Sequence, residues 1–178
     1  MPMYETTVKT PQGDEKKQVY AANVQEAKKL FDDANALLSR IVKEKLLTAN
    51  AVAGIFPAQT VNQNEILVNA GSNGKSTHRF QMLRQQNKKA DGLPNLSLAD
   101  LIAPESENKA DHIGGFIVTA GIGLDKLVAE FEKNHDDYNS IMAKALADRL
   151  AEAFAECLHE KVRREYWGYA ADEHFSND

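Results

Sequence analysis

A long stretch near the C-terminal end of the chain repeats with the spacing of an α-helix. Over residues 136–166, apolar side chains recur at every fourth position, and a row of alanines follows the same spacing. Four residues make slightly more than one helical turn, so both rows lie on neighbouring strips of one helix. The apolar row is Met142, Leu146, Leu150, Phe154, Leu158 and Val162; the small row is Ala143, Ala147, Ala151 and Ala155. We expect a helix over about 136–166, capped by Asp136 or Asp137, with a narrow sector left for solvent.

A third row on this helix is acidic. Asp148, Glu152 and Glu156 share the four-residue spacing, with Lys144 and Arg149 close to them in the chain. One interpretation is a solvated face, whose exposed ion pairs contribute about 0.2–0.5 kcal/mol each. The other is a group of carboxylates that receives a cationic ligand or the donor groups of a partner. The spacing favours the solvated face but does not decide between the two.

The first third of the chain predicts a hairpin, a helix and a strand. Residues 4–20 alternate like two strands around a break at 11–14. Asn23 is a good N-cap for an amphipathic helix that should run to about Leu47. The apolar run that follows should form a buried strand ended by Pro57.

The middle of the chain predicts antiparallel strands and short helices. Asn73-Gly74 lies between two strand-like runs and is a strong signal for a hairpin turn. The later elements are expected at 98–102, as a short helix capped by Ser97 or Asn95, at 112–118, as a central strand, and at 125–134, as a helix. No internal repeat or linker divides the chain. The fold class is therefore α+β, a single domain with an antiparallel sheet flanked by helices.

Composition argues against several classes of protein. The net charge of −5 and the short basic clusters disfavour a nucleic-acid platform. No run approaches the roughly 18 apolar residues of a membrane span, so a cytoplasmic location is the default expectation. The single cysteine, Cys157, excludes an intramolecular disulfide and is expected to be a buried, inert thiol. The five histidines are scattered, so we expect no metal site, and no serine lies in a nucleophile elbow.

Several segments together resemble a known family. "VAGIFPAQ", "LRQQ", "SLADLIAP", "ADHIGGFIVTAG" and "HDDYNSIMAKALADRLAEAFAECLHEKVRREYWGYA" occur in the order found in the C-terminal activation domain of cobalamin-dependent methionine synthase. The resemblance runs from about Glu26 to Asn177. It implies a curved α+β domain with a twisted antiparallel sheet, which binds S-adenosylmethionine and docks over the cobalamin-binding domain.

The resemblance also implies a role in a larger methyltransferase. An electron from flavodoxin or a related reductase and a methyl group from S-adenosylmethionine restore methylcobalamin on the partner domain. A module of this kind positions the donor, has no catalytic residue of its own and does not bind cobalamin directly.

The resemblance assigns roles to the acidic row. It places Glu152 near the bound S-adenosylmethionine, where a carboxylate favours a sulfonium or ammonium group. It directs Asp148 towards both the ligand site and the cobalamin domain, and it makes Arg149 and Glu156 part of the partner-facing surface.

Two features of the family are not found in this sequence. The family has a proline-rich segment beyond the C-terminal stretch, whereas no proline follows Pro104 here. It also has an aspartate in a tryptophan-containing segment before the first helix, whereas residues 1–22 contain no tryptophan and form a divergent segment. We therefore expect an activation-like domain at 23–178, truncated at both ends, that alone binds S-adenosylmethionine weakly or not at all. The alternative is a docking or structural module that has lost this ligand.

Overall fold

The computed structural model describes residues 3–10, 13–20, 24–71 and 77–173. The chain divides into two compact units, and each is built from two separate stretches. Met1–Asn50 and Val118–Cys157 form the first unit, while Ala51–Ile117 and Leu158–Asp178 form the second. Because the units interleave along the chain, no single linker separates them, which explains why the sequence shows none. The expected α+β class is confirmed.

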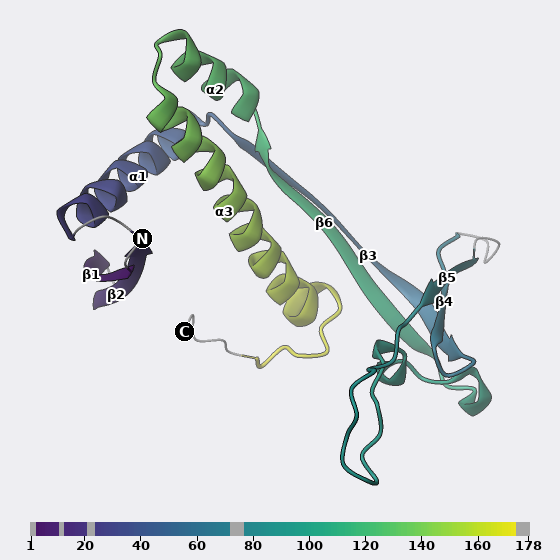
Figure 1. Cartoon of the computed structure of the whole chain (residues 1–178). Helices are drawn as coiled ribbons and strands as arrows, with labels where there is room; N and C mark the ends of the chain where they lie inside the picture. The colour runs from purple at the N-terminus through teal and green to yellow at the C-terminus, as the bar shows by residue number, and fades with distance from the viewer. Residues whose placement is uncertain (1–2, 11–12, 21–23, 72–76, 174–178) are drawn as a thin grey trace. The chain divides into compact units, whose positions relative to one another are not determined.

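The first unit is mainly helical (Figure 1). Its helices are α1 (Val24–Glu44), α2 (Leu124–Lys133) and α3 (Asp137–Lys161), whose last turn lies in the second unit. The predicted N-terminal hairpin is confirmed as β1 (Met3–Thr10) and β2 (Gly13–Tyr20), which pair antiparallel from Met3↔Tyr20 to Thr10↔Gly13.

All three helices contribute to the core of this unit. The buried side chains are Leu37 and Ile41 of α1, Leu127 and Phe131 of α2, and Met142 and Ala143 of α3. Each fully buried large side chain contributes about 1.5–3 kcal/mol relative to an exposed one. Ala143 is fully buried, so the small-residue row does allow close approach, as its spacing indicated.

A left-handed residue ends helix α1. α1 stops at Glu44, earlier than the predicted Leu47, because Lys45 adopts φ 53°. The amide of Leu46 then donates to the carbonyl of Ile41 (3.0 Å), which closes the helix end. The predicted N-cap Asn23 lies outside the described residues.

The junctions on either side of α2 explain two further sequence signals. Gly123, before α2, has φ 101°, and a Cβ there would lie 2.6 Å from the carbonyl oxygen of Leu46, so only glycine fits. At the start of α3, the Asp136 carboxylate accepts from the amide of Asn139 (3.0 Å), which confirms the predicted cap.

A four-stranded sheet organises the second unit, with strand order β5-β4-β3-β6. The strands are β3 (Thr48–Val61), β4 (Glu65–Asn69), β5 (Thr77–Gln81) and β6 (Asp111–Ile122). The β4–β5 hairpin is antiparallel, as predicted, although its turn at 72–76 lies outside the described residues. One side of the sheet packs with a short 3-10 helix, and the buried cluster consists of Ala58, Ile66, Val68 and Ala99.

Three predictions about these strands were wrong. β3 does not end at Pro57 but continues to Val61, and its segment before Pro57 is largely exposed rather than buried, with Val52 at 63% and Ile55 at 37%. Its pairing with β4 begins one residue later, at Ala58, so the missing N–H of Pro57 costs no hydrogen bond on the β4 side. The run at 112–118 was predicted to be central, yet β6 is the last strand in the order within the described residues. Most of its apolar stretch is exposed, with Ile117 at 73%, so the run of apolar residues did not indicate a buried central strand.

An arginine ties the loop after β5 to the rest of the second unit. Arg84 donates to both carboxylate oxygens of Asp100 (2.8 Å each) and to the backbone carbonyls of Gln63 and Asn95 (2.8 and 2.7 Å). Asp100 in turn completes a capping box with Ser97 on the 3-10 helix Leu98–Leu101, so the predicted cap at Ser97 is confirmed.

The long C-terminal helix extends as predicted, with a change of geometry at its end. After Lys161, residues Val162–Tyr166 form a π-helical turn. Trp167 follows, and its ring lies 3.0 Å from where a Cβ on Gly114 would be, so a larger residue at this position of β6 would require the ring to shift. Within the described residues, no helix combines the length and the apolar character that crossing a membrane requires.

Candidate functional site

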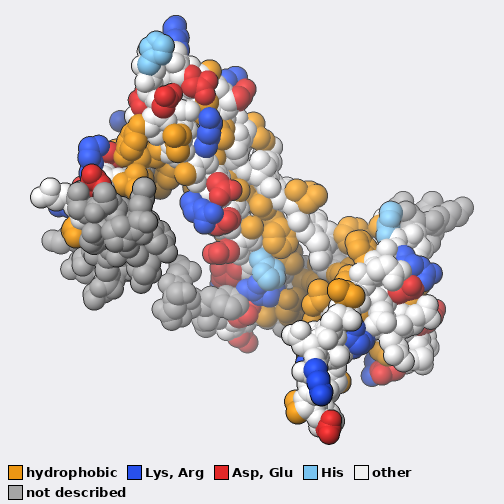
Figure 2. Space-filling model, viewed as in Figure 1, with side chains coloured by type: hydrophobic (Ala, Val, Ile, Leu, Met, Phe, Trp, Pro, Cys, Tyr) orange, Lys and Arg blue, Asp and Glu red, His pale blue; other side chains and the backbone are white. Residues whose placement is uncertain are grey.

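The acidic row lies on the solvent side of α3. Asp148, Glu152 and Glu156 are all exposed. Figure 2 shows acidic side chains following one another along this helix, with basic side chains beside them. The neighbouring apolar and alanine rows supply the packed side, where Met142, Ala143 and Ala147 are buried. The sequence therefore located the row correctly on the helix, and the structure leaves it open to ligands or partners.

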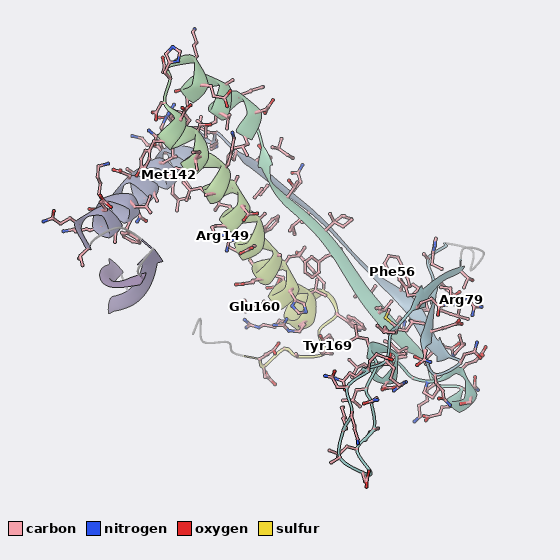
Figure 3. The ribbon with its side chains drawn as sticks, viewed as in Figure 1. Phe56, Arg79, Met142, Arg149, Glu160 and Tyr169 are labelled. Atoms are coloured by element: carbon pink, nitrogen blue, oxygen red, sulfur yellow. The ribbon has the colours of Figure 1, made fainter. Side chains whose placement is uncertain are left out.

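Arg149 joins the first two carboxylates of the row. Its Nη2 donates to Asp148 Oδ2 (2.9 Å) and to Glu152 Oε1 (2.9 Å), and its Nη1 lies 2.6 Å from Glu152 Oε2. Figure 3 labels Arg149 on the helix between Met142 and Glu160. The hydrogen bond that Arg149 donates to Asp148, together with the charge of Glu152, raises the pKa of Arg149, so the guanidinium stays charged.

Lys144 has a different partner from the one its spacing suggested. Its Nζ lies 3.8 Å from Oε1 of Glu132 in α2, and both side chains are exposed. Arg149 is thus the basic residue of α3 that donates hydrogen bonds to the acidic row, at 2.9 Å to Asp148 and to Glu152.

The exposed sector of α3 is wider than predicted. Besides the charged side chains, Ile141, Ala145 and Ala153 are exposed, because α1 and α2 cover only the strip that contains Met142 and Ala143. Cys157 belongs to this open sector. It is a free, exposed thiol, so the prediction of a buried one was wrong.

An apolar groove of about 330 Å³ lies between α1 and α3 and ends at Arg149. Its walls are Leu30 and Ala34 of α1 and Tyr138, Ile141, Met142, Ala145 and Leu146 of α3. Sequence reasoning missed this groove, because it depends on how two helices distant in the chain pack against each other. Ile141 and Ala145, which precede Met142 and Leu146 of the apolar row, are the signal that could have suggested it.

A second groove in the first unit is polar. Its volume is about 430 Å³, and it brings together Lys29, Asp33 and Arg40 of α1 with Phe131 and Tyr138. The Lys29 ammonium and the Tyr138 hydroxyl donate to Asp33 and lower the pKa of that carboxyl. Arg40 donates to Glu130 and Glu44 at 2.9 and 3.2 Å, so the charged groups here already have partners.

No metal centre is formed within the described ranges, where no group of three or more His, Cys, Asp or Glu side chains could hold an ion. The exposed row itself offers electrostatic interactions. Carboxylates on a helix surface attract cations and accept hydrogen bonds from a partner.

Comparisons with known proteins place this geometry in a family. The family described as vitamin B12 dependent methionine synthase, activation domain, matches residues 4–178. A crystal structure of the MetH reactivation domain bound to AdoHcy is similar, with 48% sequence identity and a TM-score of 0.78. The match covers 89% of this chain and 48% of that chain, so the present chain spans about half the length of the relative. The family match begins well before Glu26, where the resemblance was expected to start.

Proposed function

Because the chain belongs to the activation-domain family of vitamin B12-dependent methionine synthases, we propose that it binds an S-adenosylmethionine-type ligand and presents it to the cobalamin-binding domain of the enzyme. The observation that carries this proposal is the relative bound to AdoHcy, which is 48% identical and matches 89% of the chain. AdoHcy is the thioether that remains when S-adenosylmethionine has lost its methyl group.

The acidic row supplies a suitable charge for this ligand. S-adenosylmethionine carries a sulfonium and an ammonium group, and both are attracted by carboxylates. We assign Glu152 to the ligand and Asp148 to both the ligand and the partner domain, with Arg149 and Glu156 extending the partner-facing surface. All four side chains are exposed, so each is accessible for this role.

The chain's own part in the reaction is to orient the donor. Cobalamin would be held by the partner domain. Once reduced by one electron from flavodoxin or a related reductase, it would accept the methyl group as the C–S bond of the sulfonium breaks and AdoHcy leaves. Glu152 contributes by holding the cationic end of the donor, and Asp148 by accepting a hydrogen bond from the docked domain.

Calorimetric titration with S-adenosylmethionine and AdoHcy tests the ligand assignment. We expect Glu152→Gln, which removes charge but keeps shape, to weaken S-adenosylmethionine binding about tenfold, in line with loss of a charge-assisted hydrogen bond. Glu160→Gln is the matched control, since Glu160 pairs with Arg164 on the same helix (2.5 Å). Equal affinity of Glu152→Gln and the unchanged protein would contradict the assignment.

A second titration tests the partner. We expect the cobalamin-binding domain to bind the chain more tightly when S-adenosylmethionine is present, and Asp148→Asn to weaken that binding. The chain alone should bind the ligand more weakly than the longer relative, because it spans about half of that protein. Docking that persists with no detectable ligand binding in any mixture would instead identify a docking module without ligand.

A further inference from the structure

Three charged groups meet on the exposed side of α3. Asp148 and Glu152 carry two negative charges, and Arg149 bonds to both, so the local charge is −1 rather than −2. The side chains of all three are largely exposed: 68% for Asp148, 57% for Glu152 and 66% for Arg149. An ion pair this exposed is weak and exchanges readily with other partners.

The contacts of Arg149 suit such an exchange. Its hydrogen bonds go to side chains of its own helix, one residue before and three residues after it, and these side chains can rotate. Its stem borders the apolar groove between α1 and α3, beside Ala145 and Leu146. A long basic side chain can keep its stem on apolar surface while its charged head moves between partners.

We propose that Arg149 is a specificity-determining residue, which sets the preference of the site between the sulfonium donor and its thioether product by neutralising one of two carboxylates. This inference rests on the proposed function. The two ligands differ by the methyl group and by the positive charge of the sulfonium, so their affinities respond differently to the charge of the site. With Arg149 in place, the site binds S-adenosylmethionine only moderately more tightly than AdoHcy. AdoHcy can then leave after methyl transfer.

The same contacts link the ligand to the partner. Arg149 holds Glu152, which faces the ligand, and Asp148, which faces the cobalamin domain. A docked group that draws the guanidinium away leaves both carboxylates free and strengthens binding of the sulfonium form. Docking and donor binding are then coupled through one side chain, and the coupling acts in both directions.

The experiment measures the ratio of two dissociation constants. Calorimetry on the chain without the cobalamin-binding domain, where Arg149 contacts both carboxylates, gives the Kd of AdoHcy and of S-adenosylmethionine for the unchanged protein, Arg149→Gln and Arg149→Lys. We expect Arg149→Gln to raise the ratio Kd(AdoHcy)/Kd(S-adenosylmethionine) about threefold to tenfold at low salt, the size of one partly screened charge interaction. Arg149→Lys keeps the charge and should stay within about twofold. High salt should reduce the difference.

Arg40→Gln is the matched control. Arg40 also bonds to two carboxylates, Glu44 and Glu130, but neither belongs to the acidic row. We expect it to leave the ratio unchanged. An equal change in both affinities for Arg149→Gln, or the same shift in ratio for Arg40→Gln, would overturn the specificity role while the proposed function stands. Failure of the unchanged protein to bind either ligand overturns both.

Discussion

Two arginines of this chain bind carboxylates in different surroundings. Arg84 in the second unit bonds to Asp100 and to the backbone carbonyls of Gln63 and Asn95, and 29% of its side chain is exposed. Arg149 in the first unit bonds to Asp148 and Glu152 of its own helix, and 66% of its side chain is exposed.

The difference lies in what the partners are attached to. The carbonyls that Arg84 bonds belong to separate loops, so breaking the cluster frees chain segments as well as charges. The partners of Arg149 are flexible side chains on one helix, and the helix keeps its own backbone bonds without them. We therefore treat Arg84 and its partners (the Arg84 cluster) as a structural element of the fold. Arg149, Asp148 and Glu152 (the Arg149 cluster) form a surface group whose hydrogen bonds can exchange.

The largest effect should come from the core beneath the Arg84 cluster. Ile66 is 2% exposed, and Ile66→Ala leaves a cavity between the sheet and the 3-10 helix. We expect a loss of about 2–5 kcal/mol in the free energy of unfolding, measured by chemical denaturation. Val52→Ala is the control, since Val52 is 63% exposed, and it should change stability by less than about 0.5 kcal/mol. A similar small loss for both would show that this core is not packed as described.

A smaller effect is expected from Arg84→Gln. The loop from Gln85 to Leu96 loses the hydrogen bond from Arg84 to the Asn95 carbonyl, and Arg84 no longer links it to Asp100 and Gln63. The loop should therefore be cut severalfold faster in limited proteolysis, and the melting temperature should fall. Arg149→Gln is the comparison within the same molecule. If the two variants are cut at equal rates, the distinction between architecture and surface is lost.

The Arg84 cluster should also respond to acid. Hydrogen bonds from Arg84 and from the Ser97 amide lower the pKa of Asp100 from 3.8 to about 2. A carboxyl with a lowered pKa adds stability that is complete above its unfolded value and is lost as the pH falls through the folded value. We expect loop protection in hydrogen exchange to persist at pH 5 and to fall between about pH 4 and pH 2. Asp100→Asn should remove that step, and an unchanged step in this variant would assign it to another group.

The smallest effect on stability should be that of Arg149→Gln. Its partners are exposed and its backbone is helical throughout, so the melting temperature should match that of the unchanged protein. A clear fall in melting temperature would mean that Arg149 stabilises the helix. A change in the ratio Kd(AdoHcy)/Kd(S-adenosylmethionine) in this variant would then be attributed to the altered structure rather than to the lost charge.

The sequence predicted the elements better than their ends. The rows on α3 and the N-cap at Asp136 follow from local chemistry, and both were found where expected. The ends of α1 and β3 were misjudged because Lys45 adopts a left-handed conformation and Pro57 lies beyond the pairing with β4. These features depend on neighbours that are distant in the chain.

The site was predictable only in part. The spacing of Asp148, Glu152 and Glu156 placed them on one strip, and the family resemblance supplied their expected roles. Neither the spacing nor the resemblance showed that Arg149 bonds to both Asp148 and Glu152, or that Cys157 is exposed.

The sequence by itself determined that this chain is α+β, that a long helix carries three parallel rows, and that its segments match the activation-domain family. Periodicity fixes which side chains share a strip of a helix, because it depends only on the helical repeat. Only the tertiary structure decided which strip is covered and how α1 and α3 form the apolar groove. Both outcomes depend on packing between residues far apart in the chain, which a local pattern does not contain.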